Sequence, residues 1–306
     1  METTLKTILI IFAALLLLIG LAPLNGGQIF RRSSGGLISD GVKRKYLLYV
    51  PTSYDPTKPT PLVISLHGFK DYPARQMRKS GWNVLAEQEG FIVVYPLGSN
   101  VPPAWQLYNY KDPAANPTVD IRFISHLIDH LEQKYDIDPA RIYANGLSNG
   151  GGMSQALACV LSEQIAAIGS VVGAYFYPLD TCQPTRPVPM IAFHGTADKL
   201  VSYTGGPSER FDYPFPSIPE FMEKLAHRNG CTTTPMEQMI NSKVRSISYS
   251  GGAGGADVVL YTIEGGEHAW PVGKRLPHWL AGNASVDIDA TRVMWEFFKT
   301  HPLNKA

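Results

Sequence analysis

The alternation of short apolar runs with amphipathic helical segments most strongly limits the fold of this chain. In the helical segment at 118–136, Ile121, Ile124 and Leu127 recur at helical spacing. Buried strands that alternate with helices form a parallel sheet covered on both faces. The sequence therefore predicts an α/β fold with a mostly parallel central sheet. The predicted strands are 44–51, 61–68, 91–96, 141–145, 166–173, 189–195 and 258–265, with further helices at 81–90, after Ser148 and at 289–301.

Composition narrows the class of protein. The 306 residues carry a formal net charge of +1, and the longest basic cluster is the short stretch at 42–45. A nucleic-acid-binding domain usually shows a basic face, so that class is set aside. The sequence shows no internal repeat and no second domain boundary. It therefore predicts a single catalytic domain over 37–306. The polar stretch at 202–216 is interpreted as an insertion at the rim of the sheet.

The N-terminus has a different composition from the rest. Residues 8–22 form an apolar block that follows Lys6, short for a membrane span and typical of a secretory signal. We interpret 1–25 as a signal peptide or an N-terminal membrane anchor and 26–36 as a spacer. The protein is then expected to be secreted, or periplasmic or membrane-anchored if the segment is retained.

A possible nucleophile lies between a predicted strand and a predicted helix. Residues 146–150 read Gly-Leu-Ser-Asn-Gly and match G-x-S-x-G. In the nucleophile elbow of α/β-hydrolases, this motif holds the serine in a strained turn at the carboxyl edge of the sheet. Gly146 and Gly150 leave room for the strand and the helix to approach closely. Ser148 is therefore the candidate nucleophile.

An acid and a histidine follow in the order that the elbow requires. Asp198 comes directly after the strand at 189–195, and His268 lies in a glycine-framed loop after the last apolar strand. The alternatives for the acid are Asp180, Asp212 and Asp257, and the rival for the base is His278. His194, at the end of a strand, is interpreted as structural.

The tetrahedral intermediate of such a reaction needs two N–H donors for its oxyanion. One is expected from the backbone of Asn149, the residue after the nucleophile. The other is assigned to Phe69, because Gly68 lets the loop after the strand at 61–68 turn inward.

His126 and His130, four residues apart on one helix, resemble a metal pair, but no third ligand accompanies them. We interpret them as a solvated surface pair and predict no metal and no cofactor.

Several motifs together carry a resemblance to a known family. The chain resembles the polyhydroxybutyrate depolymerase and feruloyl/acetylxylan esterase family, which is similar to carbohydrate esterase family one. The motifs that carry the resemblance occur in the order "LHGF", "GLSNGGGMS", "RPVPMIAFHGTADKLVSYTGG" and "ADVVLYTIEGGEHAWP". The resemblance extends from about residue 37 onward. It implies an α/β-hydrolase fold, a secreted serine esterase without cofactor, and the triad Ser148, Asp198 and His268.

The resemblance also bears on substrate contacts and cysteines. It implies an aromatic wall of the cleft, for which Trp105 and Trp270 are the candidates and Tyr203 a weaker one.

Cys159, Cys182 and Cys231 suit one disulfide and one free thiol, with the pairing left open by the residues themselves. Relatives often pair the cysteine of "RNGC" with one in the later "YSG" segment, which this chain lacks. That implies an unpaired Cys231 and a Cys159–Cys182 bridge.

The predicted function is hydrolysis of a carboxylic ester through an acyl-enzyme. The ester is a polyhydroxybutyrate-type polyester, or a feruloyl or acetyl ester of plant polysaccharide. Two alternatives remain open: a serine peptidase on the same fold, and a binding protein that has lost catalysis. The expected partner is an ester substrate, with no nucleic acid and with a membrane only through residues 1–25.

Overall fold

The computed structural model describes residues 32–109, 112–207, 214–232, 234–273 and 283–303. Nearly all of them belong to one compact unit, Ser33–Ala306. Residues 1–25, interpreted as a signal peptide or anchor, lie outside the described residues. Within the described ranges, no helix has the length and apolar character needed to cross a membrane.

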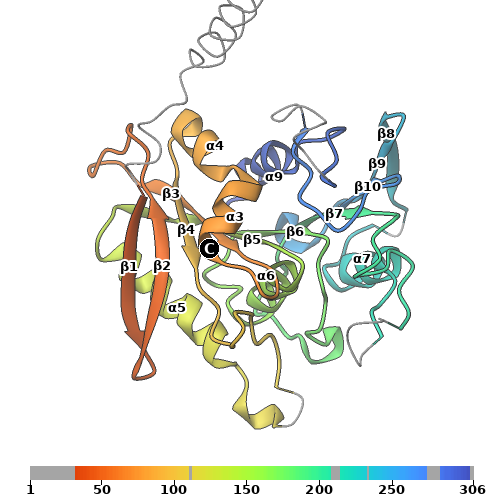
Figure 1. Ribbon diagram of the computed structural model, residues 1–306. Helices are drawn as coiled ribbons and strands as arrows, with labels where there is room; N and C mark the ends of the chain where they lie inside the picture. Colours follow the sequence, from red (N-terminus) through yellow and green to blue (C-terminus); the bar gives the residue numbers. More distant parts are fainter. Residues whose placement is uncertain (1–31, 110–111, 208–213, 233, 274–282, 304–306) are drawn as a thin grey trace, which may run out of the picture. The chain divides into compact units, whose positions relative to one another are not determined.

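Ten strands of the described chain form one sheet, with the order β1-β2-β4-β3-β5-β6-β7-β10-β9-β8 (Figure 1). The six central strands, from β4 to β10, run parallel to one another. β2 is antiparallel to β4, and the β8–β9 hairpin is antiparallel to β10. The strands are β1 Arg32–Ser39, β2 Val42–Tyr49, β3 Thr60–Leu66, β4 Ile92–Pro96, β5 Ile137–Leu147, β6 Ala167–Val171, β7 Met190–Gly195, β8 Met236–Asn241, β9 Val244–Tyr249 and β10 Val258–Ile263.

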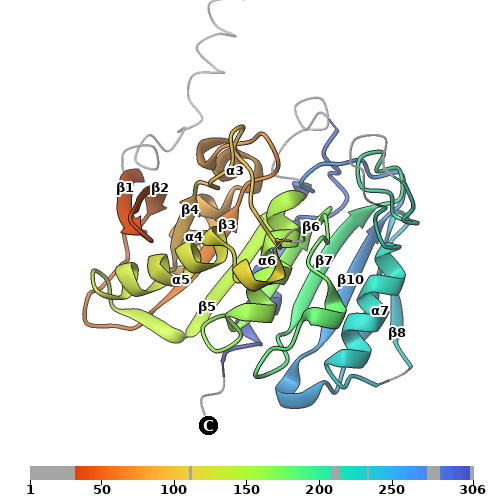
Figure 2. The same ribbon diagram turned by 90° about the horizontal axis from the view of Figure 1, so that it is seen from below.

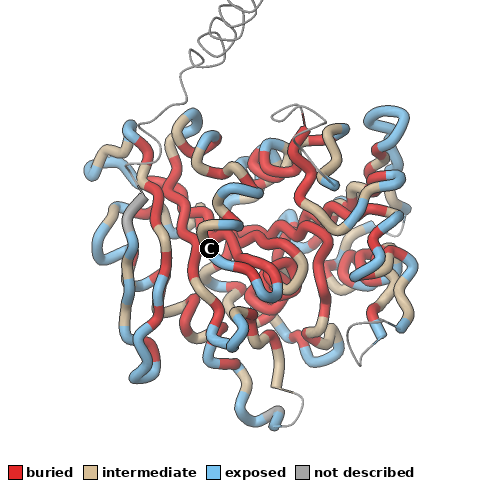
Figure 3. The backbone as a smooth tube through the Cα atoms, viewed as in Figure 1, coloured by how far each residue is buried: buried red, intermediate tan, exposed pale blue. Residues whose placement is uncertain are grey.

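Helices cover both faces of the sheet (Figure 2). α5, α6 and α7 bury their apolar residues against one face, and α4 and α9 pack on the other. Of the central strands, β3, β4, β6 and β7 are buried along their whole length, and Figure 3 shows this buried centre of the sheet. This burial explains why their sequences are continuous apolar runs. The helices are α3 Pro73–Ser80, α4 Trp82–Glu89, α5 Val119–Glu132, α6 Asn149–Val160, α7 Ile218–Arg228 and α9 Ala290–Lys299, with 3-10 turns η1 Pro113–Ala115, η2 Leu179–Thr181 and η3 Ala253–Gly255.

The structure confirms the predicted fold class and each strand and helix named from the sequence, with shifts of a few residues at their ends. One boundary differs. β1 begins at Arg32, so residues 32–36, predicted as spacer, form the first half of a strand. The sequence analysis also missed α7, β8 and β9. β8 is exposed along its whole length at the edge of the sheet. A strand with no buried face lacks the alternation by which strands are recognised.

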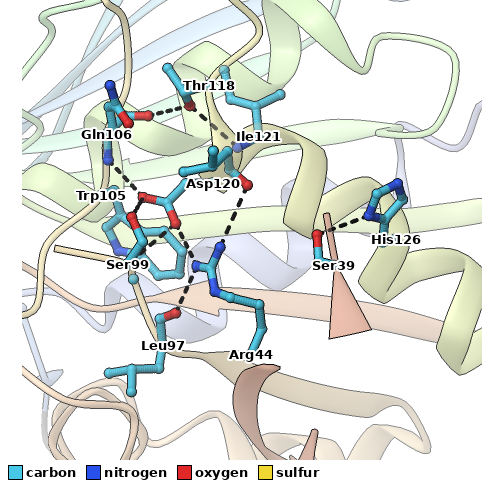
Figure 4. Close-up of polar contacts among 12 residues, drawn as sticks. Ser39, Arg44, Leu97, Ser99, Trp105, Gln106, Thr118, Asp120, Ile121 and His126 are labelled. Carbon is cyan, nitrogen blue, oxygen red and sulfur yellow. Dashed lines mark hydrogen bonds and ion pairs between the residues drawn. The ribbon is translucent and has the colours of Figure 1, made fainter. Parts of the chain in front are cut away.

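A buried ion pair fixes the loop between β4 and α5 (Figure 4). The Asp120 carboxylate of α5, with a fully buried side chain, pairs with the Arg44 guanidinium of β2 at 2.5 Å. Its two oxygens also accept hydrogen bonds from the backbone N–H groups of Ser99 and Gln106 and from the Ser99 hydroxyl. Arg44 donates further to the Leu97 carbonyl. The carboxylate thus holds both ends of the loop that carries Trp105.

Removing this carboxylate is expected to destabilise the fold strongly. Asp120→Ala leaves the buried Arg44 without its counter-charge, a change that costs about 3–5 kcal/mol of unfolding free energy in comparable sites. Urea titration followed by circular dichroism measures the loss. The control is Asp129→Ala, an exposed position on the same helix, which is expected to change the free energy by less than about 0.5 kcal/mol. Equal losses in the two variants would contradict this role of Asp120.

Candidate active site

The parallel strands bring the predicted catalytic residues to one edge of the sheet. Ser148 follows β5, Asp198 follows β7, and His268 follows β10. β7 pairs directly with β10, and β6 lies between β5 and β7. Because the carboxyl ends of parallel strands share an edge, the three loops converge there.

Ser148 occupies a strained backbone conformation between β5 and α6. Its φ is 56° and its ψ is −117°, a combination that L-residues adopt only when the surroundings enforce it. The Ser148 N–H donates to the Val171 carbonyl at 2.9 Å, and its own carbonyl accepts from Gly152 and Ala174 at 3.0 Å. These three hydrogen bonds hold the turn.

Two glycines make the turn sterically possible. A Cβ at Gly146 would lie 2.3 Å from the carbonyl carbon of Gly150. A Cβ at Gly150 would lie 2.3 Å from the Leu66 carbonyl oxygen of β3. Any side chain at either position would push α6 away from the sheet, since real Cβ contacts are longer by more than half an ångström. The spacing of the motif therefore has a direct packing cause.

Asp198 and His268 form a short hydrogen bond. Nδ1 of His268 lies 2.7 Å from Oδ2 of Asp198. The other oxygen, Oδ1, accepts from the backbone N–H groups of Leu200 and Val201, each at 2.9 Å. The Asp198 side chain is fully buried, whereas His268 keeps 16% of its side chain exposed. This is the geometry of an acid that orients a histidine toward a reacting group.

His194 contributes to the environment of the acid. Its Nε2 lies 2.9 Å from the Val201 carbonyl and 3.4 Å from Oδ2 of Asp198. The sequence analysis interpreted His194 as structural, and its burial agrees with that. Its contact with Asp198 was not foreseen, although the spacing of four residues in "HGTAD" could have indicated it.

The Asp198 carboxyl remains ionised despite its burial. Burial alone raises its pKa, but the hydrogen bonds from His194 and His268 outweigh this, and the pKa lies well below its usual range. A depressed folded-state pKa stabilises the fold above the unfolded value, near 3.9, and the contribution is lost as the pH falls below it. The negative charge on Asp198 is therefore present at any pH at which His268 can act as a base.

The loop after β3 lies against Ser148. A Cβ added at Gly68 would lie 3.6 Å from the Ser148 Cβ, which places Phe69 next to the elbow. The preceding residue, His67, is buried and holds this loop: its Nδ1 is 2.8 Å from the Gly68 carbonyl, and its Nε2 accepts from the Gly98 N–H at 3.1 Å. These two partners require a neutral ring with the proton on Nδ1.

Trp105 links the two sides of the predicted oxyanion hole. Its backbone N–H donates to Oδ1 of Asn149 at 2.7 Å, and its carbonyl accepts from Nδ2 of the same side chain at 3.2 Å. Its indole N–H donates to the His67 carbonyl at 2.8 Å. The loop fixed by Asp120 therefore holds both the residue after Ser148 and the strand end before Phe69. The assignment of Phe69 and Asn149 as donors stays a prediction.

The predicted aromatic wall is largely buried. Trp105 and Trp270 are each 2% exposed, and Tyr203 is 8% exposed. Trp105 packs beneath the elbow, and the Tyr203 hydroxyl hydrogen-bonds to Thr262 at 2.8 Å. Trp270 lines a cavity together with His268. Of the three, Trp270 is the one whose position supports substrate contact, and that role stays a prediction.

The alternative residues are placed as follows. Asp257 accepts a hydrogen bond from the Gly251 N–H, and Asp180 lies in η2; Asp198 is the one of these that contacts His268. Asp212 and His278 lie outside the described residues.

His126 and His130 are not the solvated pair predicted, because they hydrogen-bond to the Ser39 and Tyr46 hydroxyls of β1 and β2.

The disulfide implied by the family resemblance is confirmed. Cys159 and Cys182 are bonded, and Cys231 is free. The bridge joins α6, which begins after Ser148, to the residue that follows η2. Burial raises the pKa of the Cys231 thiol, which keeps it protonated and weakly nucleophilic.

This edge geometry, on this strand order, defines an α/β-hydrolase. Comparison with a solved structure agrees with that class: the chain superposes on an acetyl xylan esterase from Aspergillus awamori with a TM-score of 0.60 at 16% identity, covering 82% of this chain and all of that one. At that identity the likeness shows the fold.

Sequence comparison is more specific. Residues 44–182 match the family model described as Esterase PHB depolymerase. The chain is 31% identical over 239 residues to "Feruloyl esterase B" of Piromyces equi, covering 76% of this chain and 44% of the relative. It is 28% identical over 262 residues to "Feruloyl esterase C" of Emericella nidulans, covering 83% of each. The chain thus spans less than half of the first relative. These matches confirm the resemblance to the polyhydroxybutyrate depolymerase and feruloyl/acetylxylan esterase family.

We expect the neutral state of His67 to make stability depend on pH. Burial lowers the pKa of His67 below the usual value. In the unfolded chain the His67 ring therefore takes up a proton near pH 6.5, whereas in the folded chain the ring stays neutral at that pH. The free energy of unfolding should therefore fall as the pH is lowered from 7.5 to 5.5. His67→Gln should reduce this slope without abolishing it, because burial also lowers the pKa of His130.

Urea titrations at several pH values measure the slope for His67→Gln. His227→Gln, at an exposed position of α7, is the matched control and should keep the slope of the unmodified protein. A slope unchanged in His67→Gln would show that His67 titrates alike in both states.

Proposed function

We propose that this protein hydrolyses carboxylic esters with Ser148 as nucleophile, His268 as general base and Asp198 as the orienting acid. The observation that carries the proposal is the 2.7 Å contact between His268 and a buried, ionised Asp198 at the same sheet edge as the strained Ser148. The names of the relatives, feruloyl and acetylxylan esterases, point to the same chemistry.

The roles follow from the geometry. His268 takes the proton from the Ser148 hydroxyl as its oxygen attacks the ester carbonyl, and Asp198 stabilises the imidazolium that forms. The backbone N–H groups of Asn149 and Phe69 stabilise the oxyanion, each donor being worth about 2.7–4 kcal/mol in similar sites. The imidazolium then protonates the leaving alcohol. Water, activated by the same imidazole, hydrolyses the acyl-enzyme and regenerates Ser148.

The substrate class proposed is a feruloyl or acetyl ester of plant polysaccharide, or a polyhydroxybutyrate-type polyester. Neither the peptidase nor the inactive binding protein is favoured by an observation in the structure or among the relatives. Fold alone does not select a substrate, so this part of the proposal rests on the family resemblance.

We further propose that the protein is exported. Residues 1–25 have the composition of a signal peptide or anchor, and the Cys159–Cys182 disulfide suits an oxidising compartment outside the cytoplasm. The catalytic part then acts outside the cell, in the periplasm or at a membrane surface.

The decisive variant is Ser148→Ala. It should abolish acid release from methyl ferulate, acetylated xylan and polyhydroxybutyrate, and it should abolish labelling by a fluorophosphonate, since both need the Ser148 oxygen. Ser202→Ala, at another serine of this edge, should retain labelling and turnover. Labelling of Ser148→Ala at the level of the unmodified protein would exclude Ser148 as nucleophile, and no turnover of any ester by the unmodified protein would refute the function.

The acid is tested by Asp198→Asn. The amide keeps the shape of the side chain but presents the wrong partner to Nδ1 of His268, a change that lowers kcat by about 10⁴ in a comparable triad. Steady-state kinetics on methyl ferulate, or on whichever ester is turned over, measures the loss. Asp257→Asn should leave kcat within a factor of about two; a larger loss there than in Asp198→Asn would reassign the acid.

A further inference from the structure

A cavity of about 330 Å³ lies beside the candidate base. His268 and Trp270 of the loop after β10 line it, together with Leu147 at the end of β5 and with Arg78 and Lys79 in the last turn of α3. Ser148 is not among its lining residues. The cavity therefore belongs to the histidine side of the site.

The walls of this cavity are firmly joined. The Trp270 indole N–H donates to the Thr291 hydroxyl at 2.9 Å, and that hydroxyl donates to the Ser80 carbonyl at the end of α3 at 2.5 Å. Thr291 is almost completely buried in the first turn of α9. One hydroxyl thus connects the indole wall with the helix that carries Arg78 and Lys79.

The lining combines an apolar floor with cationic groups. Leu147, Trp270 and Val272 provide the floor, and the charged groups among the described lining residues, other than the His268 ring, are Arg78 and Lys79. Lys79 pairs with Asp71 at 2.6 Å. Arg78 forms no ion pair with another described residue, so its charge is available to a ligand. A ring that carries an anionic group would match both features.

The direction of proton transfer identifies which part of an ester reaches this cavity. The imidazole of His268 gives its proton to the oxygen of the leaving alcohol, so the group attached to that oxygen lies on the His268 side. The acyl carbon is instead bonded to Ser148, with its oxyanion turned toward Asn149 and Phe69. A cavity lined by His268 and not by Ser148 therefore accommodates the alcohol.

We propose, on the basis of the proposed function, that this cavity binds the alcohol portion of the ester and that Arg78 selects alcohols bearing a carboxylate. The chemical class is an acidic ring alcohol, such as a uronic acid unit within an acylated polysaccharide. Trp270 supports the face of the ring, and the Arg78 guanidinium pairs with the carboxylate at the mouth of the cavity.

The test compares two acetate esters that differ in the charge of the alcohol. 4-Acetoxybenzoate carries a carboxylate on the leaving ring, and 4-acetoxybenzamide replaces it with a neutral amide. The ratio of their kcat/KM values is measured for the unmodified protein, for Arg78→Gln and for Arg75→Gln. Arg75 is an exposed cation of the same helix that does not line the cavity. Comparing ratios between variants cancels the different reactivities of the two leaving groups.

Arg78→Gln should lower the anionic-to-neutral ratio roughly 2–5-fold, the effect of losing one exposed charge pair. The change should appear in KM, since the contact exists in both the ground state and the transition state. Arg75→Gln should leave the ratio unchanged, and raising the ionic strength should weaken the preference of the unmodified protein more than that of Arg78→Gln.

Three results would overturn the inference while leaving the esterase proposal intact: an unchanged ratio in Arg78→Gln, an equal decrease in Arg75→Gln, or a selectivity change confined to the acyl side. The last is measured with methyl hydrogen terephthalate against dimethyl terephthalate, in which the acyl part carries the charge. Absence of turnover of both acetates by the unmodified protein would overturn the inference. The proposed function falls as well only if methyl ferulate, acetylated xylan and polyhydroxybutyrate are also not hydrolysed.

Discussion

The close main-chain packing between β3, β5 and the first turn of α6 is the constraint on which the site depends. Gly150 has no room for a Cβ because the Leu66 carbonyl of β3 lies against it, and Gly146 has none because of Gly150. α6 therefore begins in contact with two central strands. The chain can make that connection only through a turn that forces positive φ on Ser148. The strain is held by main-chain hydrogen bonds to β6 and to its following loop, so the position of Ser148 depends on the sheet and not on one loop.

Two different kinds of polar burial then position the groups around this turn. On the acid side, a buried negative charge is satisfied by the backbone N–H groups of Leu200 and Val201 and by two imidazoles. Around the proposed oxyanion donors, the hydrogen bonds are made by neutral groups: His67 bonds to its own loop and to the Gly98 N–H, and the Trp105 backbone bonds to the Asn149 side chain. The Asp120 carboxylate, which fixes the Trp105 loop, is paired with Arg44. If the proposed donors bind an oxyanion, a neutral surrounding avoids repulsion in the transition state.

The sequence predicted the parts of this structure that are encoded locally. Continuous apolar runs identified the central strands, and G-x-S-x-G identified the elbow because its glycines act on neighbours four residues apart. The acid and the histidine could be proposed from their positions at strand ends. The contacts of His194 with Asp198 and of Trp105 with Asn149 could not, because they depend on how loops from different strands fold over the edge. The β8 strand was missed because it buries no face. The contact of His126 with Ser39 was missed because the sequence analysis predicted no strand before residue 44.

The same organisation separates chemistry from recognition. The proposed catalytic residues lie on turns that follow the central strands, whereas the cavity beside His268 is lined by α3 and by the loop after β10. The Thr291 hydroxyl of α9 connects these two walls, so their spacing depends on α9 and not on Ser148 or Asp198. Substitutions at Arg78, which projects from the last turn of α3, can alter the charge at the mouth without moving Ser148 or His268. On the proposed function, selectivity for the alcohol portion can therefore be altered at α3 while the turn at Ser148, limited by Gly146 and Gly150, stays the same.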